Sequence, residues 1–315
     1  MTDPTTLRLI VAKRRVLTPS ISEFVLAADD GGVLPDFEPG AHITIATPSG
    51  AMRRYSLVND GRAPNEYVIG IKRDSNSRGG SASMHDSALE GMAISVSEPI
   101  NQFELRDAAK YLLIAGGIGI TPILAMARRL HAEEKTFRLI YCTRSASDTA
   151  YLDEITTLYG RHAVIHHDDG EPGKVYDFWD DLVTPGSSHI YCCGPAAMME
   201  EIKAMSGHWS EDRVHFEDFR PVEVVRANDV AFSVTLANSG QVIPVPADRS
   251  ILEALRDAGV STTSSCESGT CGTCKTRLVS GAVDHRDMVL EDADRETQIM
   301  VCVSRAAQGD LVIEL

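Results

Sequence analysis

The stretch YLLIAGGIGITPILAMARRL, residues 111–130, runs from an apolar segment through a glycine-rich turn into a helical pattern. Further apolar, strand-like runs begin near residues 137, 163, 189 and 214, with helix-like stretches between most of them. Regular alternation of strand and helix predicts a parallel sheet with helices on both faces. Two of the helices are expected to begin at Thr121-Pro122 and at Gly194-Pro195, each with proline at the first helical position and the first with Thr121 as N-cap.

The part of the chain before this alternation has a different pattern of apolar and turn-forming residues. Short alternating apolar runs are separated at close intervals by glycine, proline, asparagine and aspartate. Such period-two runs predict an antiparallel sheet, which we expect to form a small β-barrel. The runs cover residues 7–11, 22–26, 42–45, 67–71 and 93–96.

The part after the alternation begins with a charged, proline-bearing stretch, residues 220–229, that is typical of a linker. We then expect a strand pair at residues 232–236 and 242–245, a short helix at 251–258 ended by Gly259, and a cysteine-rich loop. The expected domains are a barrel domain at residues 1–106, an α/β nucleotide domain at 107–222, a linker at 223–230 and a small C-terminal domain at 231–315.

Composition limits the classes of partner. The chain has 315 residues, and its 45 acidic and 30 basic side chains give a net charge of −15, which argues against wholesale binding to nucleic acid or to an anionic membrane. No apolar run is long enough to cross a bilayer, and the N-terminus lacks the features of a signal peptide. We therefore expect a cytoplasmic protein with reduced cysteines. The modular organisation favours a monomer.

Four cysteines carry the most specific signal in the sequence. Three of them follow C-x4-C-x2-C and the fourth lies further along the chain, which is the spacing of a plant-type 2Fe–2S ferredoxin. A structural zinc site would also accept four thiolates, but zinc sites usually have paired C-x2-C knuckles and only one such pair exists here. The expected ligands are Cys266, Cys271, Cys274 and Cys302.

Two glycine turns are candidates for nucleotide binding. AGGIGITP, residues 115–122, lets the backbone approach a pyrophosphate at the N-terminus of the next helix. It is not the G-x-G-x-x-G fingerprint, and Thr143-Arg144 stand where an acid would end the second strand. Cys193-Gly194-Pro195 forms a second turn, which is expected at the same sheet edge. A purely structural strand–helix turn is the alternative.

Two segments of the barrel suit a flat ring that carries a phosphate. RRYSL, residues 53–57, combines cations, an aromatic face and a hydroxyl, and KRDSNSRGGS, residues 72–81, combines basic side chains with glycine N–H groups and Ser81. Without context, a solvated basic turn would be the better interpretation of the second segment. Because the chain also contains a nucleotide domain and an iron–sulfur loop, the phosphate-binding interpretation of this segment is favoured over a solvated turn.

The order of these motifs closely resembles the phthalate dioxygenase reductase family, whose flavin-containing members supply electrons to Rieske-type aromatic oxygenases. The resemblance covers essentially the whole chain and rests on R-x-Y-S, IKRDSNSRGGS, GGIGITP, YCCGP and SCESGTCGTCKT with the distant Cys302. It implies a ferredoxin reductase-like pair of barrel and α/β domains followed by a β-grasp ferredoxin domain. A ferredoxin module at the C-terminus implies FMN rather than FAD, and the family implies NADH as donor.

The resemblance also implies the residues of the site. Contacts with the FMN ring and phosphate are expected from Arg53, Tyr55, Ser56, Lys72, Arg78, Gly79, Gly80 and Ser81, with Ser56 near the flavin N5. Contacts with NADH are expected from Gly117, Gly119 and Thr121 at the pyrophosphate, from Thr143, Arg144 and Asp168 at the ribose and adenine, and from Cys193, Gly194 and Pro195 at the nicotinamide. Phe219 is expected to border the flavin. Ser56 and Cys193 are the expected catalytic residues.

The implied activity is electron transfer. NADH would deliver two electrons as a hydride, and FMN would pass them singly to the 2Fe–2S cluster and on to a Rieske-type ring dioxygenase or demethylating monooxygenase. The acidic surface would dock against a more basic patch on that acceptor. Two alternatives stay open: the same chain of carriers serving another acceptor, such as a cytochrome P450, or a non-catalytic, zinc-bearing nucleotide-binding protein.

Overall fold

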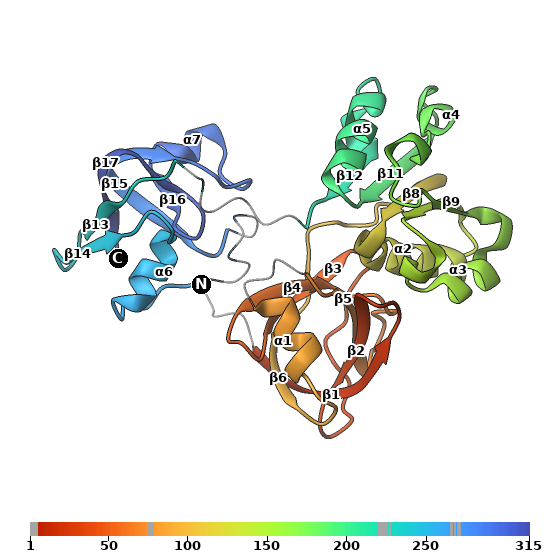
Figure 1. Ribbon diagram of the computed structural model, residues 1–315, viewed down its shortest axis with the longest axis horizontal. Coiled ribbons are helices and arrows are strands. Elements are labelled where there is room, and N and C mark those ends of the chain that lie inside the picture. Colours follow the sequence, from red (N-terminus) through yellow and green to blue (C-terminus); the bar gives the residue numbers. More distant parts are fainter. Residues whose placement is uncertain are drawn as a thin grey trace. The chain divides into compact units, whose positions relative to one another are not determined.

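A computed structural model describes residues 6–74, 79–219, 226, 228–264, 267, 269 and 272–315. The chain divides into two compact units, residues 1–219 and 220–315 (Figure 1). The first unit contains the barrel, in red to orange, and the α/β sheet, in yellow to green. No helix among the described residues is long and apolar enough to cross a membrane.

The N-terminal sheet is antiparallel and closes on itself, so the predicted barrel is confirmed. Its strands follow the order β4-β3-β6-β1-β2-β5, and a bridge between Leu57 and Ile69 joins the two ends of this order. Helix α1 (Gly80–Ser87) lies beside it. The strands are β1 (Thr6–Val16), β2 (Ile21–Ala27), β3 (Ala41–Ala46), β4 (Met52–Ser56), β5 (Glu66–Lys72) and β6 (Ala93–Ser97), with the short β7 (Ile100–Asn101) paired to β3.

The barrel interior explains why these residues form strands. Alternate side chains, such as Leu9 and Val11 of β1 and Ile43 and Ile45 of β3, are buried in one apolar core. A period of two places such residues on the same face of a strand. Strand β4 lacks this pattern because its sequence, MRRYS, is half-buried along most of its length.

The second sheet of the first unit is parallel throughout, in the order β10-β9-β8-β11-β12. Its strands are β8 (Lys110–Gly116), β9 (Thr136–Thr143), β10 (Ala163–His167), β11 (Ser188–Cys193) and β12 (Val214–Glu217). The chain moves outward from β8 to β10 and then returns to the other side of β8. The order therefore reverses between β8 and β11, which is where open α/β sheets bind ligands, beyond the carboxyl ends of the strands.

Helices cover both faces of this sheet, as predicted. Helices α2 (Ile120–Ala132) and α3 (Leu152–Tyr159) share a core with Leu113 of β8, whereas α4 (Trp179–Leu182) and α5 (Ala196–Ser206) share a separate core with its neighbour Ile114. Successive residues of one strand thus serve opposite layers.

The expected starts of two helices are wrong by one or two residues. Helix α2 begins at Ile120, so Thr121 and Pro122 lie inside its first turn, and the Thr121 hydroxyl donates to the Ile118 carbonyl instead of capping the helix. Proline is tolerated there because the first N–H groups of a helix have no intrahelical partner. Helix α5 begins at Ala196, which makes Pro195 its N-cap and not its first residue.

The second unit is a five-stranded sheet, in the order β14-β13-β17-β15-β16, packed on helix α6 (Ile251–Asp257). Ser250 and Glu253 form a capping box that fixes the start of this helix. The expected strand pair is present, and the helix ends one residue before Ala258. The strands are β13 (Phe232–Leu236), β14 (Val242–Val245), β15 (Lys275–Asp284), β16 (Gln298–Met300) and β17 (Arg305–Glu314), and the one-turn helix α7 (Asp292–Arg295) precedes β16.

Asp229, inside the expected linker 223–230, is tied to the second unit. Its carboxylate lies 2.6 Å from Arg286 Nη2 and 3.4 Å from Arg305 Nε, and both arginines are buried. Hydrogen bonds from Arg286 are the main reason why the pKa of Asp229 falls to about 2. Residues 220–225 and 227 lie outside the described residues.

Candidate active site and family

The two predicted glycine turns meet at the carboxyl edge of the parallel sheet. A Cβ atom on Gly119 would lie 2.1 Å from the Cys193 carbonyl oxygen, and one on Gly116 would lie 2.4 Å from Cδ of Pro195. These approaches exclude any larger residue at either position. The Tyr141 hydroxyl of β9 donates to the Gly117 carbonyl at 3.1 Å and so stabilises the first turn. The structure therefore brings both sequence motifs to the β8–β11 crevice.

Cys193 is the last residue of β11 and is almost completely buried. It lies opposite Ala115 of β8 on one side and opposite Glu217 of β12 on the other. Burial is the main reason why the pKa of its thiol is raised well above the usual value, and the Glu217 carboxylate raises it further. The thiol is therefore protonated at neutral pH, which rules out a thiolate nucleophile at this position.

Glu217 is a residue that the sequence analysis missed. Its Oε2 atom is buried and has no hydrogen-bond partner in the described part of the chain. Burial raises the pKa of its carboxyl to about 8, against an opposing effect of Arg54. Its position in the sequence could have identified it as a site residue, because an acid that ends the last parallel strand must lie at the same sheet edge as Cys193.

Strand β4 of the barrel places two polar side chains in buried positions without partners. The Ser56 Oγ and Tyr55 Oη atoms are buried and form no hydrogen bond with the described residues. Burial raises the pKa of Tyr55 to about 12, although Arg53 opposes the shift, so its hydroxyl keeps its proton. Buried polar atoms without partners are costly, and here they fit a polar group that these side chains would hold.

The phosphate end of the expected flavin site is formed around the start of α1. Gly79 has a left-handed φ of 99° and is the N-cap, and the first turn of the helix contains no acidic residue. The Ser81 hydroxyl accepts the Asp74 N–H at 3.2 Å, and Arg53 lies against Gly80, whose Cβ would be 2.8 Å from the Arg53 Nε atom. A helix N-terminus beside the Arg53 guanidinium suits a phosphate. Lys72, also expected here, is exposed at the end of β5, and Arg78 lies outside the described residues.

The barrel and the α/β sheet are joined directly next to these motifs. Arg128 of α2 donates to the Val58 carbonyl at 2.7 Å and forms a two-point ion pair with Glu154 of α3. Thr121 packs so close to Gly70 of β5 that a Cβ there would be 2.8 Å from the Thr121 Cγ2 atom. Thr121 is consequently a buried contact between domains, and its hydroxyl is already used by Ile118.

The expected adenosine contacts lie at the carboxyl ends of β9 and β10. Asp168 N–H donates to the Thr143 carbonyl, which places Thr143, Arg144 and Asp168 on adjacent strand ends. The Thr143 hydroxyl is buried against Thr149 at 2.7 Å, whereas Arg144 is exposed. Phe219, at the end of the first unit, is also partly exposed. The roles of these four residues, like those of the other predicted cofactor contacts, remain predictions.

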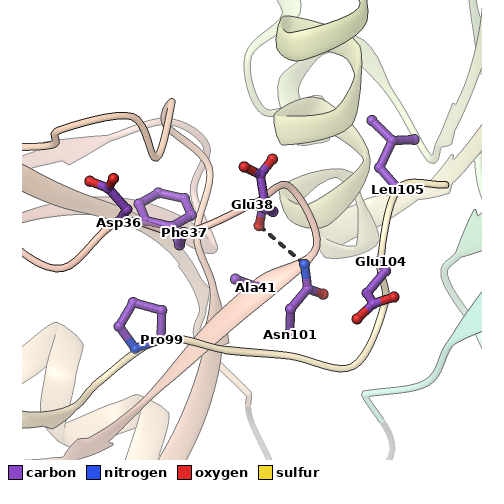
Figure 2. A pocket seen from close by; sticks show the side chains of 8 residues that line it. All are labelled: Asp36, Phe37, Glu38, Ala41, Pro99, Asn101, Glu104 and Leu105. Atoms are coloured by element: carbon purple, nitrogen blue, oxygen red, sulfur yellow. Dashed lines mark hydrogen bonds between the residues drawn. The ribbon is translucent and has the colours of Figure 1, made fainter. Parts of the chain in front are cut away.

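A separate pocket with a volume of about 530 Å³ lies between the barrel and the segment that leads to β8 (Figure 2). The Asn101 side chain spans it and donates to the Glu38 carbonyl at 3.3 Å. The carboxylates of Asp36, Glu38 and Glu104 line the pocket, and none of its lining residues is a predicted cofactor contact. The Glu38 carboxylate is paired with Arg129 at 2.6 Å. Because neither glycine turn lines the pocket, we do not assign it to the dinucleotide.

In the second unit, Cys274 and Cys302 lie at one end of the β15–β16 pair. Cys274 immediately precedes β15, Cys302 follows β16, and the register pairs Lys275 with Met300. Both cysteines are buried in the apolar core and neither is in a disulfide. Buried thiols at one sheet end fit two ligands of a cluster. Cys266 and Cys271 lie outside the described residues.

Comparisons with known proteins decide the family. The chain is 51% identical over 313 residues to phthalate dioxygenase reductase from Burkholderia cepacia, covering 98% of this chain and 97% of that protein. The chain belongs to the phthalate dioxygenase reductase family. Within the family it is also 47% identical to the phthalate 4,5-dioxygenase reductase subunit of Pseudomonas putida, over 97% of this chain and 95% of that one.

The solved structures and domain families agree with this membership. A structure of phthalate dioxygenase reductase matches with a TM-score of 0.85 at 50% identity, covering 98% of both chains. The 2Fe-2S iron-sulfur cluster binding domain matches residues 234–307, and the oxidoreductase NAD-binding domain matches residues 113–204. As a member of the phthalate dioxygenase reductase family, the chain is an NADH-dependent flavin iron–sulfur oxidoreductase that uses FMN and a 2Fe–2S cluster. The zinc alternative is thereby excluded.

Proposed function

We propose that this reductase passes electrons from NADH to a Rieske-type terminal oxygenase that acts on an aromatic substrate. The observation that carries the proposal is the likeness, along nearly the whole chain, to two reductases whose names specify phthalate dioxygenases. Vanillate O-demethylase oxidoreductase from a Pseudomonas strain is 38% identical over 98% of the chain, so a demethylating monooxygenase is included in the proposed acceptor class. We also propose that the protein works in the cytoplasm as a monomer.

In this proposal the unpartnered atoms of β4 hold the flavin. The Tyr55 and Ser56 hydroxyls meet its ring, and Arg53 with the start of α1 meets its phosphate. When bound, FMN connects a donor of electron pairs with an acceptor of single electrons. The protein does not need a covalent nucleophile, because its task is to orient the two rings and to exclude water.

The turns at the sheet edge orient NADH. Gly117 and Gly119 present backbone to its pyrophosphate, and Cys193, Gly194 and Pro195 border its nicotinamide. The neutral Cys193 thiol and the protonated Glu217 carboxyl form an uncharged wall there near neutral pH. Uncharged, buried side chains exclude water from the site. They also do not attract the positively charged nicotinamide ring of the product, NAD⁺, as a carboxylate would.

A reconstitution experiment tests the acceptor. Purified reductase is combined with NADH, phthalate dioxygenase, phthalate and dissolved oxygen, and oxygenated product is measured per NADH consumed. We expect tightly coupled turnover that is lost in Cys302→Ser and kept in the matched variant Cys142→Ser, which changes a half-buried cysteine of β9 in the other unit. Oxidation of NADH without oxygenated product would contradict the proposal.

A cytochrome P450 is the second candidate acceptor, because one specific likeness favours it. The chain matches an intact type IV self-sufficient cytochrome P450 monooxygenase with a TM-score of 0.76 at 32% identity, covering 98% of this chain and 41% of that one. The same assay with an isolated haem domain of such an enzyme distinguishes the two. Reduction of the haem faster than of the dioxygenase would favour the P450.

A further inference from the structure

A short turn in the second unit, Asp287–Leu290, is held in place by one buried carboxylate. The Asp287 side chain is fully buried and accepts the N–H groups of Val289 at 3.1 Å and of Leu290 at 2.8 Å. The Ser304 hydroxyl donates to its other oxygen at 3.4 Å, and Leu290 is buried in the core. The backbone of this turn is therefore fixed at both ends, and we call it the exit turn.

The exit turn presents two apolar side chains to solvent. Met288 is 68% exposed and Val289 is 37% exposed, although they are neighbours on a rigid backbone. An isolated exposed apolar residue is common, but an adjacent pair on a fixed turn is a surface that a partner can cover. Methionine is well suited to this role because its flexible, polarizable side chain adapts to different shapes.

The exit turn contacts the segment that contains the predicted cluster ligands. The Met288 N–H donates to the Gly269 carbonyl at 2.9 Å, and a Cβ on Gly272 would lie 3.4 Å from the Val289 Cγ1 atom. Gly269 and Gly272 both lie between the first and last cysteines of the C-x4-C-x2-C motif. A molecule bound to Met288 and Val289 would consequently approach the cluster closely, and electron transfer slows steeply with distance.

The rim of this surface is acidic. Glu291, Asp292 and Glu296 are exposed directly after the turn, and Arg295, the one basic residue of α7, lies 3.6 Å from Asp292. On the other flank, Arg286 is buried in ion pairs with Asp229 and Asp284 and so offers no free cation. An apolar centre with a negative rim complements a partner with an apolar depression surrounded by lysine and arginine.

We propose that the exit turn is where the electron acceptor docks, and that the acceptor is a protein with a basic rim around a shallow apolar patch. The inference rests on the proposed function, since it concerns the oxygenase that receives the electrons. Each encounter moves one electron from the reduced cluster to the oxidised metal centre of the acceptor. Two encounters use the electron pair of one NADH, and no atom crosses the interface.

The test uses the holoprotein and cytochrome c, a strongly basic acceptor of single electrons. The dissociation constant is measured by calorimetry on the two oxidised proteins at low salt, without NADH, so that the readout does not depend on turnover. Met288→Ser with Val289→Ser is expected to weaken binding five- to tenfold, and Glu291→Gln with Asp292→Asn to weaken it and flatten its salt dependence. Matched controls on the same unit are Val242→Ser, which is 60% exposed, and Asp257→Asn, whose side chain is 67% exposed. They are expected to change binding less than twofold.

Stopped-flow measurements decide whether the exit turn serves the external acceptor or electron transfer within the protein. The NADH-driven reduction of flavin and then of cluster within the protein should be unchanged in all variants, while reduction of cytochrome c slows in parallel with binding. Equal effects in test and control variants would overturn the proposal, and so would a slower reduction of the cluster in Met288→Ser with Val289→Ser. If phthalate dioxygenase is not turned over by the unmodified protein, the proposed function fails, whereas the cytochrome c data still decide the docking surface.

Discussion

Cys193 and Glu217 lie directly opposite each other on the parallel strands β11 and β12, at the carboxyl edge of the sheet. Burial raises both pKa values, that of the thiol well above its usual range and that of the carboxyl to about 8. Near neutral pH the pair therefore carries protons and no charge. An exposed pair at this edge would instead place a carboxylate beside the turns where we propose that NADH binds.

Replacing Glu217 by glutamine should change how stability depends on pH. The carboxyl pKa is raised from 4.5 to about 8 in the folded protein, so the folded state holds a proton that the unfolded state releases between these values. The free energy of unfolding of the unmodified protein must then fall as pH rises through this interval. Glutamine has no such proton, so Glu217→Gln should match the unmodified holoprotein near pH 5. Near pH 8.5 it should be more stable by about 4 kcal/mol, which corresponds to a melting temperature about 10 °C higher.

The control for this prediction is Glu211→Gln, which changes an exposed carboxyl just before β12. Its melting curve should follow that of the unmodified protein at both pH values. Parallel pH curves for Glu217→Gln and the unmodified protein would show that the Glu217 carboxyl is not buried in the protonated form.

Ser56→Ala should slow the reduction of flavin by NADH without unfolding the barrel. The Ser56 hydroxyl has no partner in the described part of the chain, so its loss removes no hydrogen bond within the protein. We expect stability within about 0.5 kcal/mol of the unmodified protein and a rate of flavin reduction about tenfold lower in stopped flow, which corresponds to about 1.4 kcal/mol.

Ser97→Ala is the matched control for Ser56. The Ser97 hydroxyl accepts the Thr44 N–H at 3.0 Å and donates to the Glu98 carbonyl at 2.8 Å. Its loss should lower the stability by about 1 kcal/mol and leave the flavin reduction rate unchanged. If Ser56→Ala instead lowered the stability and left the flavin reduction rate unchanged, Ser56 would be a structural residue.

Gly119→Ala should weaken productive NADH binding. Its Cβ would lie 2.1 Å from the Cys193 carbonyl oxygen, and that oxygen belongs to backbone that cannot rotate away. The two turns must then separate, and we expect kcat/KM for NADH to fall at least about tenfold. Gly173→Ala is the control, because nothing lies within 4 Å of its Cβ. Normal NADH kinetics in Gly119→Ala would show that the contact between the turns is not needed.

Cys302→Ser should remove the iron–sulfur signal and spare the flavin. Serine is a poor substitute for a thiolate ligand of iron. We expect the EPR signal of the reduced cluster to disappear and cytochrome c reduction to fall far more than flavin reduction by NADH. Cys142→Ser should keep both activities. A persistent EPR signal in Cys302→Ser would exclude this residue as a ligand.

Much of the architecture followed from local patterns. The period-two runs around Leu9 and Ile43 and the alternation that begins at residue 111 identified both sheets of the first unit, because burial of one strand face leaves a direct trace in the order of residues. The cysteine spacing identified the iron–sulfur domain for a similar reason, since three of the four predicted ligands lie close together in the chain. Strand β4 left no such trace, because its first four residues are all half-buried and no alternation of buried and exposed side chains marks its two faces.

The helix starts show where local reasoning fails. A threonine followed by proline is a typical helix start, yet α2 begins one residue before Thr121 because the turn must fit against Cys193 of another strand. Pro195 becomes an N-cap for the same reason, as its ring packs against Gly116. A contact between residues far apart in the chain leaves no mark on the local sequence pattern of either segment, so it cannot be predicted from that pattern.

The sequence by itself determined the order of the domains, the class of each sheet, the cluster motif and the family resemblance, because all of these are encoded by neighbouring residues. Only the tertiary structure decided that Glu217 lies beside Cys193 and carries a proton, and that the Tyr55 and Ser56 hydroxyls are buried without partners among the described residues. It also decided that Met288 and Val289 contact Gly269 and Gly272. Burial, pKa and the choice of hydrogen-bond partner depend on which distant segments meet. Those quantities therefore appear only once the chain has folded.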